Sequence, residues 1–188
     1  MSIVSVVIPA HNQAAFLTQA IESVLGQAMG DWELIIVDDG STDETRRVVA
    51  SYTGDRRVQY VAQPRQERAA ARNRGVRLSS GRYLAFLDAD DIWLPEKLAR
   101  QVQVLEAHPE AGLCYTLTKR VDAQGRLLDA AWPPGGYEGD VVAPLIRGSF
   151  IITSTVMVPR AWGDEAGWFD ETLPAFGAED WDLWLRLA

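Results

Sequence analysis

The first half of the chain alternates short apolar runs with segments of helical periodicity, and this alternation restricts the folds that are open to it. The apolar runs are bounded by turn-forming residues and predict strands at residues 4–8, 34–37, 58–61 and 83–87. The helical segments that follow them lie at residues 16–25, 41–49, 67–78 and 95–105. Strands that alternate with single helices form βαβ units, so we expect an α/β domain with a mainly parallel sheet covered by helices on both faces.

Local signals mark the starts of two of these helices. Ser41 and Glu44 form a capping-box pattern at the start of the second helix. Pro95 suits the first turn of the fourth helix, whose apolar residues at 98, 102 and 105 share one face. We therefore expect each helix to pack one apolar face on the sheet.

The second half of the chain departs from this rhythm. Residues 113–121 have the pattern of a strand, and residues 122–125 that of a turn leading to another. A Pro-Pro-Gly-Gly loop or lid follows at 133–136, and a further β-branched strand is expected at 151–158. The last residues, 181–188, predict a helix that the end of the chain interrupts, so we expect a C-terminal portion to be missing from this single domain.

Charge and composition limit the partners that such a domain can bind. The 188 residues carry a formal net charge of -8, which argues against broad nucleic-acid binding because that needs a positive surface. A nucleotide ligand stays possible, because a divalent cation can supply positive charge locally. Cys114 is the single cysteine, which excludes an internal disulfide and favours a small buried apolar residue over a nucleophile.

No targeting or membrane segment is expected in this sequence. The first residues lack the basic region of a signal peptide, and no uninterrupted apolar stretch approaches the ~20 residues of a membrane-spanning helix. A lone cysteine also fits a reducing compartment. These features predict a cytoplasmic location, with or without peripheral attachment to the inner face of the membrane.

Three of the predicted strands end in polar residues, which is where an open α/β sheet binds its ligands. These ends lie at residues 9–12, 38–43 and 88–91, and the last two are strongly acidic. Asp88 and Asp90 stand two residues apart in an extended segment, so both carboxylates can face one side. A plain turn explains this Asp-x-Asp equally well. Together with the acidic end at residue 38, however, it indicates a site for Mg²⁺ or Mn²⁺ and a diphosphate.

A second acidic pair, Glu179 and Asp180, opens the last helix. Acidic residues at a helix N-terminus are favoured by the helix dipole, so a purely structural cap is one explanation. The other explanation comes from Trp181 and Trp184, because aromatic faces often line sugar or base sites. A carboxylate beside such a wall can act as a general base toward an acceptor hydroxyl.

Two further polar residues lie near the strand ends. Arg72 follows three alanines, which permit close helix packing, and its guanidinium could reach a phosphate or a base. A solvent-exposed arginine is the commoner situation for such a residue, and it suits Arg74 and Arg77 better. His11 is explained as a loop residue whose ring hydrogen-bonds to the backbone.

Five short strings, in this order, resemble the family-2 glycosyltransferases, which have the GT-A fold. They are VVIPAHN at 6–12, IVDDGSTD at 36–43, ARNRG at 71–75, FLDADD at 86–91 and EDWDLW at 179–184. The resemblance runs along nearly the whole chain. It implies a GT-A, Rossmann-like sheet with a nucleotide-binding half at 1–110 and a smaller, mixed or antiparallel acceptor-side half at 111–188.

The resemblance also implies roles for individual residues. Asp180 would be the general base, with Glu179 and Trp181 on the acceptor side. Asp90, within the DXD motif, would bind Mn²⁺ or Mg²⁺ bridging the diphosphate, and Arg72 would contact the base or the diphosphate. The nucleotide-sugar site would consist of Pro9, Ala10, His11, Asn12, Asp39, Arg72, Asp88, Ala89 and Asp90.

The activity implied by this family is transfer of a hexose from a nucleoside-diphosphate sugar to an acceptor hydroxyl, with inversion at the anomeric carbon. UDP is the expected carrier, with GDP and dTDP open. The acceptor would be a saccharide or a lipid-linked molecule, in cell-wall or polysaccharide biosynthesis. The Gln/Arg-x-x-Arg-Trp signature of processive synthases does not occur in this sequence.

Three other classes of protein agree less well with this sequence. A sugar-nucleotide pyrophosphorylase needs a glycine-rich, basic loop after the first strand, and a dinucleotide-dependent oxidoreductase needs Gly-x-Gly-x-x-Gly there. Residues 9–12 supply neither. A non-catalytic nucleotide-sugar-binding module would tend to lose an acidic residue, whereas Asp88, Asp90 and Asp180 are all present.

Overall fold

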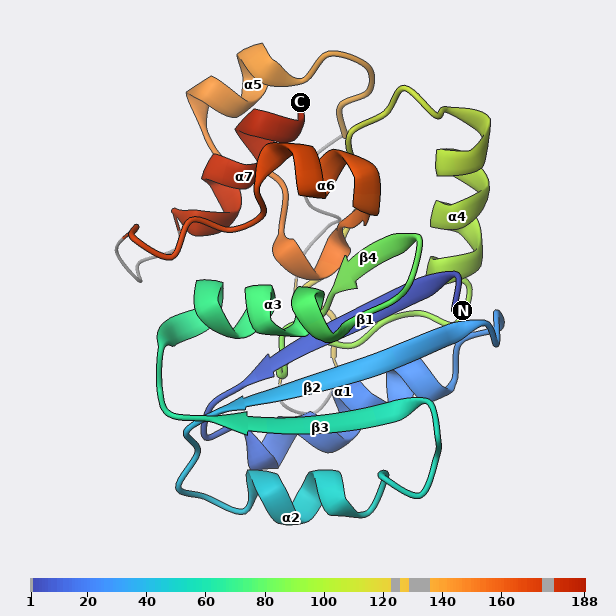
Figure 1. Ribbon diagram of the computed structural model, residues 1–188. Coiled ribbons are helices and arrows are strands. Elements are labelled where there is room, and N and C mark those ends of the chain that lie inside the picture. Colours follow the sequence, from blue (N-terminus) through green and yellow to red (C-terminus); the bar gives the residue numbers. More distant parts are fainter. Residues whose placement is uncertain (1, 123–125, 129–135, 174–177) are drawn as a thin grey trace.

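The computed structural model describes residues 2–122, 126–128, 136–173 and 178–188. Among them, five strands form one sheet in the order β3-β2-β1-β4-β5 (Figure 1). The four strands β3, β2, β1 and β4 run parallel, and β5 is antiparallel to β4. The strands are β1 (Val4–Ala10), β2 (Trp32–Asp39), β3 (Val58–Gln63), β4 (Tyr83–Phe86) and β5 (Met157–Pro159).

Helices cover both faces of the sheet. In Figure 1, α1 and α2 lie below it and α3 above it, while α5, α6 and α7 gather beyond α3. The helices described are α1 (Ala14–Leu25), α2 (Thr45–Ala50), α3 (Glu67–Leu78), α4 (Lys97–Ala107), α5 (Val142–Arg147), the 3₁₀ helix η1 (Thr153–Thr155), α6 (Arg160–Ala166) and α7 (Glu179–Leu187).

The core divides at β1 because successive side chains of a strand point to opposite faces. Val4, Val6 and Ile8 belong to a buried cluster that includes the inner faces of α1 and α4. Val7 belongs to the opposite cluster, with residues of α3 and α7. The sheet is therefore buried on both faces, as expected of parallel strands.

Small residues let α3 lie close against the sheet. A Cβ atom added at Gly75 would stand 2.3 Å from a methyl carbon of Val7. Ala71 is fully buried against Ile35 and Val37 of β2. The alanines before Arg72 have the packing role expected of them, and this close approach fixes the height of α3 above the sheet.

The predictions for the first half are confirmed except at the starts of two helices. Pro95 is not in the first turn of α4, because α4 begins at Lys97 with Glu96 as its N-cap. The four strands and α3 lie where expected, and residues 98, 102 and 105 are buried on α4. The capping box is wrong: α2 begins at Thr45, and the Ser41 hydroxyl accepts a hydrogen bond from the backbone of Asn12 instead. The Asp43 carboxylate accepts hydrogen bonds from the backbone N–H and the hydroxyl of Thr45, the first residue of α2, whose N-cap is Glu44.

Predictions for the second half hold less well. The strand at 113–121 is wrong: over the described part of the chain this segment forms isolated bridges, among them Cys114 with Met157 and Val121 with Leu127. The expected strand at 151–158 is wrong in its first part, where η1 forms, and only β5 remains. The helices α5 and α6 were not predicted. Most of the turn at 122–125 and of the loop at 133–136 lies outside the described residues.

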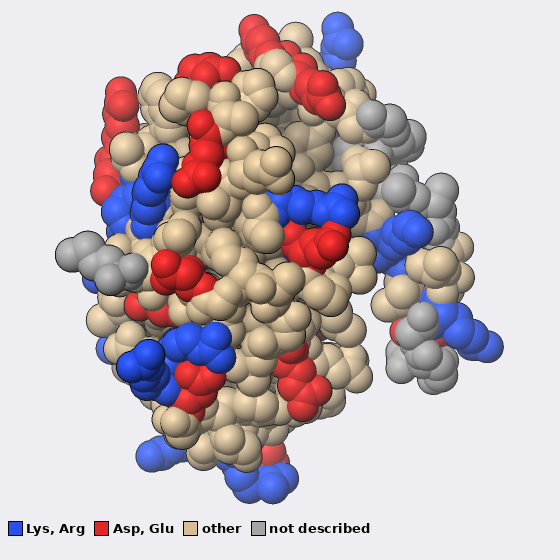
Figure 2. Space-filling model, turned by 90° about the vertical axis from the view of Figure 1, so that its right-hand side faces the viewer, with Lys and Arg blue, Asp and Glu red and all other residues tan. Residues whose placement is uncertain are grey.

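The surface and the solitary cysteine agree with a globular domain. Figure 2 shows Lys and Arg interspersed with Asp and Glu on one face of the molecule. No helix in the described ranges is long and apolar enough to cross a membrane. Cys114 is half-buried and packs against the core cluster of β1. Burial raises the pKa of its thiol, so the residue is a packing element and a poor nucleophile.

Candidate active site

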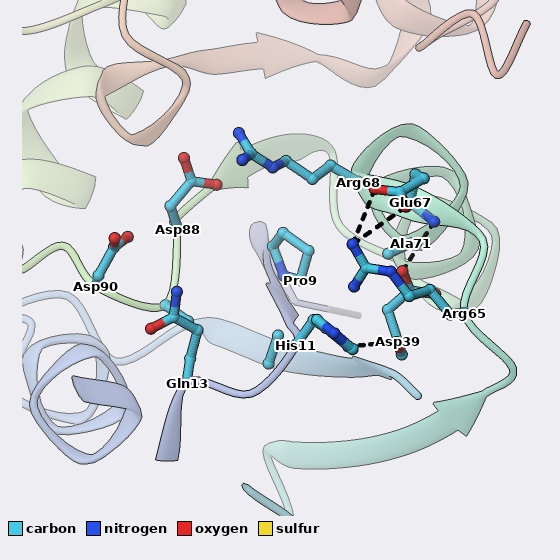
Figure 3. A pocket seen from close by; sticks show the side chains of 12 residues that line it. Pro9, His11, Gln13, Asp39, Arg65, Glu67, Arg68, Ala71, Asp88 and Asp90 are labelled. Carbon is cyan, nitrogen blue, oxygen red and sulfur yellow. Dashed lines mark hydrogen bonds and ion pairs between the residues drawn. The ribbon is translucent and has the colours of Figure 1, made fainter. Parts of the chain in front are cut away.

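The carboxyl ends of β1, β2 and β4 surround a pocket of about 240 Å³ (Figure 3). β1 and β4 are parallel neighbours in the sheet although two strands separate them in the sequence, so the order in which strands are added to the sheet switches sides between them. Open α/β sheets bind ligands at such a point. The pocket is lined by Pro9, Ala10, His11, Gln13, Asp39, Arg65, Glu67, Arg68, Ala71, Asp88, Ala89 and Asp90.

Asp39 is buried at the base of this pocket and holds the start of α3. One carboxylate oxygen accepts hydrogen bonds from the Gln63 amide and the Gln66 backbone N–H, each at 2.8 Å. The other accepts the Glu67 backbone N–H at 2.9 Å. The Nδ1–H of His11 donates to the Asp39 carbonyl at 2.9 Å, which confirms the backbone role expected of that ring. These hydrogen bonds of Asp39 hold the start of α3 and the loop after β1 in place around the pocket.

Asn12 is the predicted residue of the first loop that does not line the pocket. Its backbone is in the left-handed region, with φ 54°, which asparagine tolerates better than most residues. Its side-chain oxygen accepts hydrogen bonds from the backbone N–H groups of Thr42 at 2.8 Å and Asp43 at 3.3 Å. Asn12 therefore ties the loop after β1 to the loop after β2.

Asp88 and Asp90 both line the pocket, from the end of β4 (Figure 3). The Asp88 backbone N–H donates to the Ser154 hydroxyl at 3.0 Å, and one carboxylate oxygen accepts from Arg72 at 2.8 Å. Asp90 is exposed and has no hydrogen bond or ion pair with any described residue. Asp38, the other acidic residue of the β2 end, is absent from the wall and bonds instead to Ser41 and Tyr60.

These two aspartates suit a hard cation that a ligand helps to hold. Both carboxylate oxygens of Asp90, and the Asp88 oxygen that does not bond to Arg72, can bind a cation. No group of three or more His, Cys, Asp or Glu in the described ranges could hold a metal ion unaided. Mg²⁺ is typically bound by one or two carboxylates plus substrate phosphates, so the donor set fits a metal that arrives with a diphosphate.

Five residues of the pocket lining were not predicted from the sequence: the charged Arg65, Glu67 and Arg68, together with Gln13 and Ala71. Arg68 is exposed, has no ion pair among the described residues, and points across the pocket toward Asp88 (Figure 3). Arg65 pairs with Glu67 at 3.1 Å. Two arginines just after the carboxyl end of a strand, in a chain of net charge -8, were a usable signal for an anion site.

Glu67 stands at the first position of α3 with a strained backbone. Its φ is 73°, a region that side chains other than glycine rarely adopt. Such strain often collects at functional sites. Here the conformation turns the Glu67 N–H toward the Asp39 carboxylate.

Arg72 lies elsewhere than on the pocket wall. Only 1% of it is exposed, so the alternative of a solvent-exposed arginine is wrong. Its guanidinium bonds to Asp88 and to Glu179, each at 2.8 Å. Burial opposes the charge, but these two carboxylates outweigh it and raise the pKa of Arg72. Arg72 joins the end of β4 to the start of α7, and the structure does not place it against a base or a diphosphate.

Asp180 does not line the pocket. Its carboxylate is held by two hydrogen bonds. Its Oδ2 accepts from the Thr153 hydroxyl at 2.9 Å, and its Oδ1 accepts from the backbone N–H of Trp181 at 2.7 Å. Burial raises the pKa of this carboxyl, and the nearby charge of Glu179 adds to the rise. Asp180 is thus a carboxylate whose basicity exceeds that of an ordinary aspartate.

The aromatic residues around this pair have different roles from those expected. Trp184 is fully buried and packs against Phe169 at a ring-centroid distance of 6.2 Å, so it belongs to the core and forms no wall. Trp181 is half-buried and donates its indole N–H to the Leu145 carbonyl at 2.8 Å. Only Trp181 keeps a surface that a ligand could meet.

Comparison with known proteins identifies the family of this chain and its fold. The sequence model described as "Glycosyl transferase family 2" matches residues 5–162. An uncharacterized glycosyltransferase of Rickettsia bellii is 34% identical over 185 residues, which are 98% of this chain and 26% of that protein. The chain thus spans about a quarter of that relative's length.

Two solved structures share the fold. Staphylococcus aureus TarS 1-349, in complex with UDP-GlcNAc, superposes with a TM-score of 0.76 at 20% identity, over 100% of this chain and 53% of that one. The mannosyltransferase PcManGT of Pyrobaculum calidifontis, in complex with GDP-Man and Mn²⁺, gives 0.72 at 23% identity, over 95% and 50%. The GT-A fold expected from the sequence is confirmed, and this chain belongs to glycosyl transferase family 2.

Proposed function

We propose that this chain is the donor-binding and catalytic unit of a metal-dependent, inverting glycosyltransferase. It moves a sugar from a nucleoside-diphosphate donor, with UDP as the carrier, to a hydroxyl of a saccharide or lipid-linked acceptor. One observation carries the proposal. Two acidic sites far apart in the sequence, Asp88 with Asp90 and Asp180, are connected through Arg72 and through η1.

Donor binding is assigned to the pocket at the ends of β1, β2 and β4. Pro9, Ala10 and His11 form one wall for the base and ribose, above the buried Asp39. The guanidinium of Arg68 has no ion pair among the described residues and points toward Asp88, beside which a diphosphate would lie. TarS binds UDP-GlcNAc and PcManGT binds GDP-Man in the same fold, which supports a nucleotide-sugar donor here.

Asp90, with the free oxygen of Asp88, would hold Mn²⁺ or Mg²⁺ beside the diphosphate. When bound, the ion would stabilise the negative charge that develops on the departing diphosphate. PcManGT contains Mn²⁺, which supports this assignment. Arg68 would add a second positive charge on the side of the pocket that α3 forms.

Asp180 is assigned as the general base. The acceptor O–H gives its proton to the carboxylate while the oxygen forms a bond to the anomeric carbon. The bond from that carbon to the diphosphate oxygen breaks, and its electron pair leaves with the diphosphate. Attack opposite the leaving group inverts the configuration, and the raised pKa of Asp180 makes it a stronger proton acceptor.

The variant Asp180→Asn tests this assignment. It keeps the shape of the side chain and removes its basicity, so binding of UDP is expected to survive while transfer falls by at least ~100-fold. Asp182→Asn is the matched control, because Asp182 lies on the same helix and pairs with Arg186. Transfer at the wild-type rate by Asp180→Asn would exclude Asp180 as the base.

A further inference from the structure

The short helix η1 consists of three hydroxyl residues buried between the two acidic sites. Thr153, Ser154 and Thr155 are 3%, 5% and 5% exposed. Buried hydroxyls need hydrogen-bond partners, because an unsatisfied one costs about 1–3 kcal/mol. The partners of these three residues show what the segment holds in place.

Two side chains hold the backbone of η1: Trp93, which precedes α4, and Gln101 of α4. The indole N–H of Trp93 donates to the Ser154 carbonyl at 2.6 Å. The amide of Gln101 donates to the Thr155 carbonyl and to the Cys114 carbonyl, each at 2.9 Å. These donors are buried, so η1 has a fixed position relative to the sheet.

On its other side, η1 contacts both acidic sites through consecutive residues. The Ser154 hydroxyl accepts the backbone N–H of Asp88 at 3.0 Å. The Thr153 hydroxyl donates to Oδ2 of Asp180 at 2.9 Å. The end of β4 and the carboxylate on α7 are therefore set at a constant separation by two neighbouring side chains.

We infer that Thr153 is a positioning residue for the transfer reaction, holding the Asp180 carboxylate in the orientation that accepts the proton of the acceptor hydroxyl. The inference rests on the proposed role of Asp180 as the base. Oδ1 is oriented by the Trp181 backbone and Oδ2 by Thr153, so the hydroxyl removes the remaining rotational freedom of the carboxylate. A base that is already held in the reactive orientation increases the rate of transfer without any additional contact to the substrate.

A hydroxyl that served only to stabilise the start of α7 would behave differently. Thr153 donates its proton to the charged form of Asp180, which lowers the pKa of that carboxyl against the effect of burial. Two charged groups also act on Asp180: Glu179 of its own helix, which raises the pKa, and Arg72 of α3, which lowers it. Removing the Thr153 hydroxyl therefore changes the pH dependence of transfer, whereas loss of stability alone does not.

The experiment compares Thr153→Val, Thr153→Ser and Thr155→Val in the purified chain, with a nucleotide sugar that the wild type transfers. For Thr153→Val we expect kcat to fall roughly 10–100-fold, as for a misplaced catalytic group, with the donor KM within about 2-fold. In the plot of kcat/KM against pH, the acid limb is expected to shift to higher pH by about 0.5–1 unit. Thr153→Ser restores the hydroxyl and should recover both quantities.

Thr155→Val is the matched control. It removes a hydroxyl of the same helix that donates to the Ile152 carbonyl, so its acid limb should stay at the wild-type pH. If Thr153→Val fails to fold, Thr153→Ala replaces it, with the same expected values.

The inference is overturned if the Thr153 variants keep the wild-type kcat and acid limb while Asp180→Asn loses transfer; the proposed function then stands. If Asp180→Asn transfers normally, the base assignment fails, and the inference fails with it.

Discussion

Arg72 and Glu179 stand 107 residues apart in the sequence and form a buried ion pair at 2.8 Å. The same guanidinium holds Asp88 at 2.8 Å, so one side chain of α3 connects the end of β4 with the start of α7. A buried pair of this kind contributes little net stability over an apolar replacement, but loss of one partner strands the other charge. The role of this ion pair is geometric, because it fixes Asp88 relative to the helix that carries Asp180.

Loss of the Arg72 charge is expected to destabilise the fold strongly. Arg72→Met leaves Glu179 and Asp88 without their partner, and removal of one member of a buried pair costs about 3–5 kcal/mol. Urea unfolding followed by circular dichroism measures the free energy of unfolding. Arg77→Met is the control on the same helix: its pair with Glu171 is long, at 3.6 Å, and exposed, so a change within about 0.5 kcal/mol is expected. Equal effects of the two variants would contradict the structural role of Arg72.

Binding of UDP is expected to depend on a divalent cation. With Mn²⁺, Asp90 and the nucleotide phosphates share one ion, so affinity should rise roughly 10-fold or more over that in a chelator. Isothermal titration calorimetry gives both values. In Asp90→Asn the gain should largely disappear, while the affinity in chelator stays close to that of the wild type. Equal affinity of the wild type with Mn²⁺ and with chelator would rule out the proposed metal bridge.

Arg68 is expected to contribute to donor affinity. A hydrogen bond to a charged group is worth about 1.5–3 kcal/mol, so Arg68→Ala should raise the donor KM by about 10-fold or more. Arg77→Ala removes an arginine of the same helix that does not line the pocket, and its donor KM should match that of the wild type. Steady-state kinetics over a range of donor concentrations tests this, and a normal KM for Arg68→Ala would place the diphosphate elsewhere.

Lys97 predicts a dependence of stability on alkaline pH. It is 8% exposed, lies over the Trp93 ring at 4.1 Å, and burial lowers its pKa to about 7. Between pH 7 and about 10.4 the unfolded chain binds a proton that the folded chain does not, so stability rises with pH by up to about 1.4 kcal/mol per unit. Below pH 7 this contribution is constant.

Lys97→Met is expected to abolish that slope. Urea unfolding at pH 7, 8 and 9 measures it as the difference between wild type and variant. The chain has one other lysine, the exposed Lys119, so Lys119→Met supplies the control and should keep the wild-type slope. An unchanged slope in Lys97→Met would mean that Lys97 stays charged in the folded protein.

Much of the first half could be predicted from local patterns. α3 has the bounds expected from the sequence, and the strands follow from their short apolar runs. The convergence of residues 9–11, 39 and 88–90 follows from parallel topology, since parallel strands end at one edge of a sheet. Arg68 lies outside the five motif strings, so none of them marks it as a pocket residue.

The second half was harder because its residues take their conformation from distant partners. Thr153 and Thr155 have β-branched side chains that favour strands. Their hydroxyls instead bond to Asp180 and to the Ile152 carbonyl, and a 3₁₀ turn results. Residues 113–121 also depart from the expected strand, because among the described residues they form isolated bridges and no ladder.

The order of residues along the chain was enough to specify the α/β architecture, the family and the acidic character of the site, because periodicity, turn chemistry and short motifs are properties of neighbouring residues. Tertiary packing alone decided that Arg72 is buried between Asp88 and Glu179, and that η1 links Asp88 to Asp180. These pairings join segments up to 107 residues apart. Their geometry depends on how closely α3 and α7 pack around the sheet, which no local pattern encodes.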